Sequence, residues 1–297
     1  MLRFGIDLGG TKIELCAIAQ GRELHRERIA TPAHDYDAIV RALAGLVENA
    51  ERTLGERGSV GICTPGAISS KTGCIKNSNT VCLNGRPLDR DLARLLQREI
   101  RIENDANCFA LSEAIDGAAA DAPVVFGVIL GTGVGGGIVV HGRCLKGCNA
   151  IAGEWGHIAL PYLDAADLPQ PSCYCGRNGC VETYLSGRGL SDELERRSNQ
   201  RLQAHDVAQL AAAGDAHASA ALDRYAERLA RGLSVVINVL DPDVIVLGGG
   251  LSLIGALYES VPPKLPKYVF SDSVATRLVP AQHGDSSGVR GAALLWA

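Results

Sequence analysis

The chain has 297 residues, of which 46% are hydrophobic and 21% are charged, and its formal net charge is -4. This length accommodates two lobes, and the composition excludes an intrinsically disordered chain. The negative balance, without a dense stripe of Lys and Arg, argues against a nucleic-acid-binding protein. The chain opens without a basic and apolar leader, and no apolar stretch approaches the roughly 18 residues of a membrane span. We therefore expect a cytoplasmic protein without a membrane partner.

Predicted strands and helices alternate in the first half of the chain. Short β-rich runs predict strands at residues 2–8, 13–19, 23–31, 59–64 and 100–103. Apolar residues at helical spacing predict helices near residues 36–50 and 88–96. A third helix is predicted over residues 105–119, and either Asn104 or Asp105 is placed to cap it.

The second half echoes this layout without repeating residue identities. Strands are predicted at residues 124–130, 137–140 and 244–247, and the last is a continuous apolar run typical of a buried strand. A long apolar stripe predicts a helix from Ala218 to Leu240, which Asp241-Pro242 ends. The recurrence indicates a boundary between two halves near residues 117–123.

The first of three glycine-rich loops is Asp7-Leu8-Gly9-Gly10-Thr11-Lys12. Its glycines let backbone N–H groups approach an anion, and Thr11 and Lys12 add a hydroxyl and a positive charge. Asp7 can hold Mg²⁺ through water, because this ion prefers oxygen ligands and keeps much of its hydration. The spacing is not that of a Walker loop, and an ordinary hairpin turn is the alternative.

The other two loops are Gly131-Thr132-Gly133 and Gly248-Gly249-Gly250. Five glycines within residues 131–137 are difficult to explain by packing alone, although a flexible surface hairpin is the alternative. The third loop follows a buried strand, where α/β proteins admit ligands, and a plain turn is the alternative. Three such loops in one chain favour a site for phosphate groups.

Asp105 is the candidate for acid–base chemistry. It lies at a predicted strand end, in Glu103-Asn104-Asp105-Ala106-Asn107, where a substrate hydroxyl can reach it. Phosphoryl transfer needs a base or an orienting group for the attacking hydroxyl, and Asp commonly serves. The alternative is that Asp105 is only the N-cap of the next helix.

Three of the ten cysteines form a cluster. Cys173, Cys175 and Cys180 are two and then five residues apart among glycines, and His157 precedes them. These four residues predict a Cys₃His structural zinc site without an open position, and a disulfide or reduced thiols are the alternatives. The other seven cysteines are scattered and are expected to be free thiols: Cys16, Cys63, Cys74, Cys82, Cys108, Cys144 and Cys148.

Two carboxylates, Glu154 and Glu182, flank the cysteine cluster together with His157. Polar groups held next to a rigid metal site suit the recognition of several hydroxyls. The alternative is a solvated surface, or support of the metal ligands.

In their order and combination, these motifs resemble the ROK family of sugar kinases and sugar-responsive repressors over nearly the whole sequence. The resemblance is carried by residues 7–12, 65–66, 103–107, 131–133, 154–157, 173–182 and 248–250. Within the family, residues 83–88 and 283–291 are most similar to bacterial fructokinases of the manno(fructo)kinase type. The stretch between His157 and Cys173 is longer than in many glucokinases of the family.

The resemblance implies a two-lobed α/β fold of the actin-like ATPase or hexokinase type (ribonuclease H-like), with a cleft between the lobes. It implies a small lobe at residues 1–117, a large lobe at residues 118–284 and a terminal helix at residues 285–297 that returns to the small lobe. It further implies ATP-dependent phosphorylation of a hexose with Mg²⁺ and a structural Zn²⁺, and a homodimer. Fructose is the first expectation, and glucose, mannose or N-acetylglucosamine are the alternatives.

The resemblance also implies residue roles. Asp105 is expected to be the catalytic base, and the sugar is expected to contact Asn79, Asn104, Asp105, Glu154, His157 and Glu182. One rival is a non-catalytic sugar-responsive regulator. Family repressors carry a DNA-binding domain before the first phosphate loop, which begins here at residue 7. Another rival is an ATPase of the same fold that acts on proteins, against which the zinc cluster and the hydroxyl-binding carboxylates argue.

Overall fold

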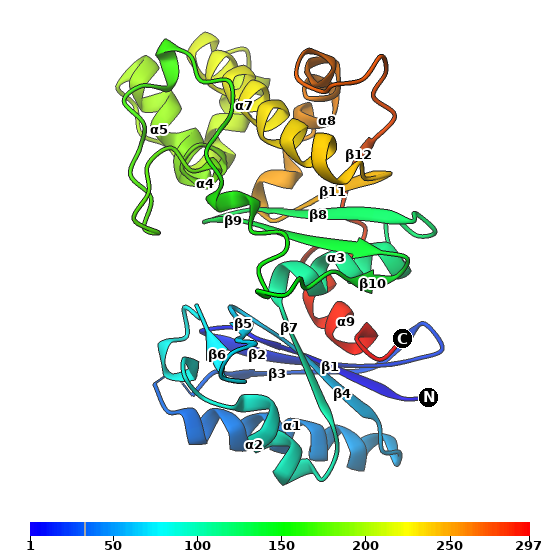
Figure 1. Ribbon diagram of the computed structural model, residues 1–297. Coiled ribbons are helices and arrows are strands. Elements are labelled where there is room, and N and C mark those ends of the chain that lie inside the picture. The colour runs from blue at the N-terminus through cyan, green and yellow to red at the C-terminus, as the bar shows by residue number, and fades with distance from the viewer. Residues whose placement is uncertain (33) are drawn as a thin grey trace. The chain divides into compact units, whose positions relative to one another are not determined.

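The computed structural model describes residues 1–32 and 34–297, which divide into two compact units (Figure 1). The first unit comprises Met1–Asp121, Gly137–Ala152 and His283–Ala297, and the second comprises Ala122–Gly136 and Gly153–Gln282. Residues 137–152, which the resemblance places in the large lobe, thus cluster with the first unit. Within the described ranges, none of the helices has the length and apolarity that crossing a membrane requires.

The first unit is built on a five-stranded sheet in the order β3-β2-β1-β4-β7. β2 pairs antiparallel with both β1 and β3, whereas β1, β4 and β7 run parallel. The carboxyl ends of these three parallel strands therefore meet at one edge. The strands are β1 (Arg3–Leu8), β2 (Lys12–Ala19), β3 (Arg22–Ala30), β4 (Ser59–Thr64) and β7 (Ile100–Asn104), and β5 (Ala67–Ile68) pairs separately with β6 (Ile75–Lys76).

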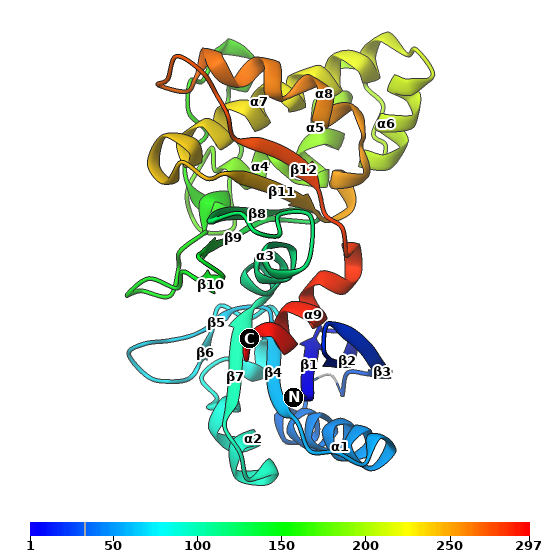
Figure 2. The same ribbon diagram turned by 90° about the vertical axis from the view of Figure 1, so that its right-hand side faces the viewer.

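Helices cover both faces of this sheet. α1 (Tyr36–Leu54) and α2 (Leu88–Leu96) lie on one face, and α9 (Ser287–Leu294) lies on the other (Figures 1 and 2). α3 (Asp105–Ile115) packs beside α9. The core under α1 and α2 is formed by aliphatic side chains of the sheet and of both helices. Two 3₁₀ turns complete the unit, η1 (Val81–Leu83) and η6 (Gly284–Ser286).

Glycines let α9 approach its neighbours closely. A Cβ atom at Gly61 of β4 would clash with the carbonyl oxygen of Ala292, and one at Gly291 would clash with that of Cys108. Backbone oxygens cannot move aside as a flexible side chain can, so these two positions require glycine. The close packing fixes α9 against β4 and against α3.

The second unit contains a sheet in the order β10-β9-β8-β11-β12, of which residues 137–140 and β10 cluster with the first unit. β11 pairs parallel with β8 and with β12. α7 and α8 lie over β8 and β11 (Figure 1). The strands are β8 (Val124–Leu130), β9 (Val134–Val140), β10 (Arg143–Cys144), β11 (Val244–Gly248) and β12 (Arg277–Pro280).

Five helices and four 3₁₀ turns belong to the described part of the second unit. The long helix α7 buries an apolar stripe and begins at the N-cap Asp215, which accepts a hydrogen bond from the backbone N–H of Ala218. The helices are α4 (Val181–Leu185), α5 (Gly187–Ser198), α6 (Ala204–Ala212), α7 (Ala216–Leu240) and α8 (Ala256–Ser260). The turns are η2 (Trp155–His157), η3 (Ala165–Asp167), η4 (Gly250–Leu253) and η5 (Pro262–Lys267).

Candidate functional site

Two carboxylates lie at the carboxyl edge of the first sheet. Asp7 is near the end of β1 and is paired across the sheet with Cys63 of β4. Asp105 follows β7 directly and opens α3. In open α/β sheets, this edge is where ligands bind.

The surroundings of Asp7 favour a cation. Burial raises the pKa of Asp7 above its usual value, a hydrogen bond from the Cys63 thiol opposes this rise, and the nearby charge of Asp105 adds to it. A Cβ atom at Gly288 would lie 3.6 Å from Oδ2 of Asp7, so the start of α9 closes this side of the carboxylate. Two neighbouring carboxylates repel each other until a positive charge is shared between them, and hydrated Mg²⁺ fits such an oxygen site.

The helix cap and the candidate base are separate residues. Asn104 is the N-cap of α3, and its Oδ1 accepts a hydrogen bond of 2.8 Å from the backbone N–H of Asn107. Asp105 occupies the first helical position with an exposed side chain, and its Oδ1 accepts a hydrogen bond of 2.9 Å from the N–H of Ala106. The interpretation of Asp105 as the N-cap alone is therefore wrong.

An ion pair that the sequence did not reveal holds this strand-to-helix turn. Glu103 is buried, and its Oε1 accepts hydrogen bonds of 3.1 Å from the N–H of Asn104 and from Nδ2 of Asn107. Its Oε2 lies 2.7 Å from Nζ of Lys146. The Glu103 carboxylate, which is paired with Lys146, thus fixes the turn that carries Asp105.

The first glycine-rich loop is exposed at Gly10, Thr11 and Lys12. The N–H of Gly9 donates to the carbonyl oxygen of Lys12 over 3.0 Å, which closes the hairpin. Thr31 of the neighbouring segment donates its hydroxyl to the carbonyl oxygen of Gly9 over 2.7 Å. The loop is therefore held by its carbonyl groups on one side, and its exposed backbone can approach an anion.

Asn79 is exposed on a loop that Asn84 holds. Oδ1 of Asn84 accepts a hydrogen bond of 2.9 Å from the N–H of Ser78, and its Nδ2 donates one of 2.8 Å to the Ser78 carbonyl oxygen. One side chain thus binds both polar groups of the residue before Asn79. This gives Asn84 a positioning role that its sequence motif did not indicate.

The other two glycine loops share one edge of the second sheet. Gly131-Thr132-Gly133 follows β8 and Gly248-Gly249-Gly250 ends β11, and Gly248 pairs with Ile129 across the two parallel strands. Gly249 has φ 79°, and a Cβ atom there would meet the carbonyl oxygen of Leu130. The close approach of the two strand ends thus requires glycine at position 249. At Gly131 and Gly250, by contrast, a Cβ atom would have nothing within 4 Å.

Both loops line a cavity of about 1400 Å³ within the second unit. Its walls come from α5, α6, α7, α8 and η4 and are mostly small and apolar, with Arg188 and Arg201 among the lining residues. A large concave site with apolar walls and a few polar groups suits an organic ligand, and glycine loops at its edge suit phosphates. Sequence reasoning found the loops but missed the helical walls.

The predicted metal ligands come together. One ligand atom from each of His157, Cys173, Cys175 and Cys180 lies within 4.8 Å of all the others. Sγ of Cys175 is 3.6 Å from Sγ of Cys180, and Sγ of Cys173 is 3.6 Å from Nδ1 of His157. Two sulfurs bound to one tetrahedral zinc at about 2.3 Å lie about 3.8 Å apart, so the set fits this ion.

Two further contacts shape the cluster. Hydrogen bonds from the backbone and the side chain of Arg177 lower the pKa of Cys175, which favours its thiolate form, whereas burial raises the pKa of the neighbouring Cys180. Nε2 of His157 lies 2.9 Å from the hydroxyl of Tyr174, so this ring nitrogen faces away from the sulfurs. Tyr174 is a neighbour that the sequence did not indicate.

The predicted sugar contacts are distributed over both units. Asn79, Asn104 and Asp105 belong to the first unit. Glu154, His157 and Glu182 belong to the second, where Oε2 of Glu182 accepts a hydrogen bond of 2.9 Å from the N–H of Val134. That contact holds Glu182 beside the glycine loop. Oε2 of Glu182 lies so close to Gly133 that a Cβ atom at this position would be only 2.6 Å from it.

Glu154 is exposed beside the buried Trp155, whose indole N–H donates to the Gly135 carbonyl oxygen over 2.9 Å.

Comparisons with known proteins agree on one family. The ROK family model matches residues 3–297. An N-acetyl-D-glucosamine kinase of Escherichia coli O1:K1 / APEC is 43% identical over 298 residues, which cover 98% of each chain. A ROK hexokinase of Thermus thermophilus superposes with a TM-score of 0.87 at 33% identity, over 99% of this chain and 97% of that one. A ROK family glucokinase of Streptomyces griseus, solved with glucose and AMPPNP, superposes with a TM-score of 0.77 at 27% identity, over 99% of both chains.

Proposed function

The chain belongs to the ROK family, and from this premise we propose that it is an ATP-dependent hexose kinase, that is, an ATP:hexose phosphotransferase. The observation that carries the proposal is the pair of neighbouring carboxylates, Asp7 and Asp105, at the carboxyl edge of the first sheet. The actin-like fold of its structural neighbours supports the same class of reaction.

In the proposed reaction, Asp105 accepts the proton of a primary hydroxyl of the hexose. The hydroxyl oxygen forms a bond to the γ-phosphorus of ATP, the bond from that phosphorus to the β–γ bridging oxygen breaks, and ADP leaves. Such catalysis consists mostly of positioning and of charge neutralisation. Mg²⁺, when bound, neutralises charge on the β- and γ-phosphates, and Asp7 is the residue proposed to hold it through water.

The remaining residues are proposed to bind and orient. The glycine loops at residues 9–12, 131–133 and 248–250 are proposed to hold the phosphates, and the cavity of the second unit is proposed to take the nucleoside. Asn79, Asn104, Glu154, His157 and Glu182 are proposed to contact the sugar. The cysteine cluster would hold a structural zinc with four protein ligands, which supplies no nucleophile.

Two hexoses have specific support. The 43% identity to an N-acetyl-D-glucosamine kinase over 98% of the chain favours N-acetyl-D-glucosamine. The segments at residues 83–88 and 283–291 resemble fructokinases and favour fructose. None of the three relatives described above is named a fructokinase. Fructose and N-acetyl-D-glucosamine are therefore both proposed as candidate substrates.

A coupled assay of ADP release tests the function and separates these hexoses. We expect purified protein with ATP and Mg²⁺ to release ADP only when a hexose is present, and we expect one hexose of a panel to exceed the others in kcat/KM by about tenfold or more. The panel contains N-acetyl-D-glucosamine, fructose, glucose and mannose. Hexose binding by calorimetry without ADP release would contradict the kinase and indicate a sugar-responsive regulator.

Gly10→Ala isolates the role of the first phosphate loop. Its Cβ atom would lie 3.6 Å from Oγ1 of Thr80, an ordinary contact, so the fold tolerates the methyl group while a phosphate oxygen loses its approach. We expect the KM for ATP to rise about tenfold, with thermal stability within about 0.5 kcal/mol of the wild type.

The matched control is Gly45→Ala in α1, whose Cβ atom would meet nothing within 4 Å and which should leave the KM for ATP unchanged. Gly133 is less suitable, because a side chain there would also displace Glu182. An unchanged KM for ATP in the Gly10→Ala variant would remove this loop from the nucleotide site.

We propose that the reaction takes place in the cytoplasm. None of the ten cysteines is paired in a disulfide, which suits the reducing cytoplasm. A homodimer remains a prediction of the family resemblance.

A further inference from the structure

The segment that joins the metal ligands His157 and Cys173 contains a compact acidic turn. Asp164 caps η3, and its Oδ1 accepts a hydrogen bond of 2.9 Å from the N–H of Ala166. In return, the N–H of Asp164 donates to Oδ2 of Asp167 over 3.0 Å. This reciprocal capping gives the turn a defined shape in the middle of an otherwise irregular stretch.

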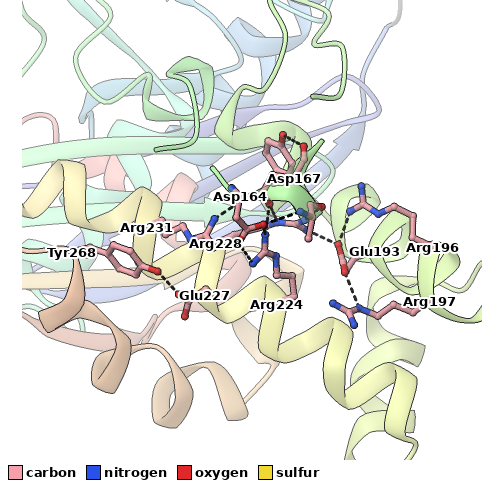
Figure 3. Close-up of polar contacts among 12 residues, drawn as sticks. Asp164, Asp167, Glu193, Arg196, Arg197, Arg224, Glu227, Arg228, Arg231 and Tyr268 are labelled. Atoms are coloured by element: carbon pink, nitrogen blue, oxygen red, sulfur yellow. Dashed lines mark hydrogen bonds and ion pairs between the residues drawn. The ribbon is translucent and has the colours of Figure 1, made fainter. Parts of the chain in front are cut away.

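Three arginines of α7 bind the carboxylate of Asp167, whose exposed fraction is 0% (Figure 3). Arg224 reaches Oδ1 with Nη2 at 2.8 Å, Arg228 reaches Oδ1 with Nε at 2.9 Å, and Arg231 reaches Oδ2 with Nη1 at 2.8 Å. Residues three and four apart share one face of a helix, so α7 presents all three guanidinium groups to the turn. Burial alone would raise the pKa of Asp167, but the backbone N–H of Asp164 and the charge of Arg228 hold it below its usual value.

Two more carboxylates balance the arginines. Oδ2 of Asp164 accepts hydrogen bonds of 2.8 Å from Nη1 of Arg224 and 2.9 Å from Nη2 of Arg231. Nη1 of the buried Arg228 donates to Oε2 of Glu193 in α5 over 2.8 Å. Glu193 also accepts hydrogen bonds from Arg196 and Arg197 of α5, so five guanidinium groups and three carboxylates form one ionic network (Figure 3).

The same turn is fastened to the helix that carries Glu182. The hydroxyl of the buried Tyr184 donates to the carbonyl oxygen of Asp167 over 3.0 Å, and the guanidinium of Arg228 lies 5.0 Å from the centre of the Tyr184 ring. α4 is a single short helix that begins after the metal ligand Cys180, so Glu182 and Tyr184 move together with that ligand.

We propose that Asp167, assisted by Asp164, is a positioning residue that locks the segment between the metal ligands onto α7 and α4. The lock preorganises the cysteine–histidine set before a metal binds, and it fixes Glu182 for the sugar. The part of this inference that concerns the sugar rests on the proposed kinase function, and the part that concerns the metal does not.

The test uses the whole zinc-loaded chain and two variants. Asp167→Asn removes the charge that all three arginines share, and Asp164→Asn removes only the more exposed charge while its amide oxygen can still cap Ala166. We expect both variants to release zinc to a chromogenic chelator about tenfold faster than the wild type, because residues that orient metal ligands typically affect metal affinity to this extent. We expect a rise of about fivefold in the KM for the hexose, and a KM for ATP within about twofold of the wild type.

Hydrogen exchange of the metal-free protein measures preorganisation directly. In the wild type, the amides of residues 158–172 should stay protected after zinc is removed, and in the variants this protection should be lost. The matched control is Glu227→Gln, which lies on the same helix and accepts a hydrogen bond from the Tyr268 hydroxyl (Figure 3). Glu227 pairs with Lys264 and Lys267 of η5 and not with the three arginines. It should change neither zinc release nor the protection of residues 158–172.

The outcomes separate the two proposals. If Asp164→Asn releases zinc at the wild-type rate and keeps the protection of residues 158–172, the positioning role is wrong, whether or not Asp167→Asn folds. If zinc release and protection change as expected but no hexose is phosphorylated by the wild type, the kinase function fails and the positioning of the metal ligands stands.

Discussion

Asp105→Asn should reduce kcat by about 100-fold or more while the KM for the hexose changes little. The substitution keeps the shape of the side chain and removes the carboxylate that is proposed to accept the proton of the attacking hydroxyl. The fold should tolerate it, because Asn104 caps α3 and an amide oxygen can still accept the hydrogen bond from Ala106. Steady-state kinetics with the preferred hexose, together with hexose binding by calorimetry, measure both effects.

A true helix cap provides the control for this prediction. Asp35 caps α1 by accepting a hydrogen bond of 3.0 Å from the N–H of Ala38. Asp35→Ala should cost about 1 kcal/mol of stability and leave kcat unchanged. If Asp105→Asn behaves in the same way, with lower stability and near-normal kcat, then Asp105 is structural and the proposed base is wrong.

The strands and helices of the first unit could largely be predicted from the sequence, but the end of α3 could not. The strands expected at residues 2–8 and 100–103 are β1 and β7 to within a residue. The helix expected over residues 105–119 ends at Ile115, because the Glu113 carboxylate accepts a hydrogen bond of 2.9 Å from the N–H of Ala118 and turns the chain there. A glutamate inside a helical pattern carries no signal for such a contact, so only the tertiary structure reveals it.

The candidate site was predictable wherever a local motif carries the chemistry. Glycines after strands, a carboxylate at a strand end and the spacing of the cysteines all concern residues close together in the chain. The ion pair of Glu103 with Lys146 and the bonds from α7 to Asp167 join residues 43 and about 60 positions apart. Charged residues are abundant on any surface, and nothing in a single sequence tells which pairs will meet.

The identity of the hexose lies beyond both the motifs and the fold. Glu154, His157 and Glu182 are polar groups that suit the hydroxyls of any hexose. Discrimination between two hexoses requires a difference of a few kcal/mol in transition-state binding, which one or two contacts can supply. For this reason, the assay with the panel of hexoses, rather than the fold, identifies the preferred substrate.

Cys175→Ser should abolish zinc binding, because the serine hydroxyl does not form the thiolate that completes the tetrahedral set. We expect zinc content to fall towards zero, thermal stability to drop, and the KM for the hexose to rise more than the KM for ATP. The KM values should separate because Glu154 and Glu182 flank the cluster, whereas none of the four metal ligands lines the cavity proposed for the nucleotide. Cys148→Ser, which removes an exposed thiol outside the cluster, should leave all of these quantities unchanged. Elemental analysis of the purified wild type is decisive, since an active preparation made without chelator that holds well under one zinc per chain would show that the cysteines are plain thiols.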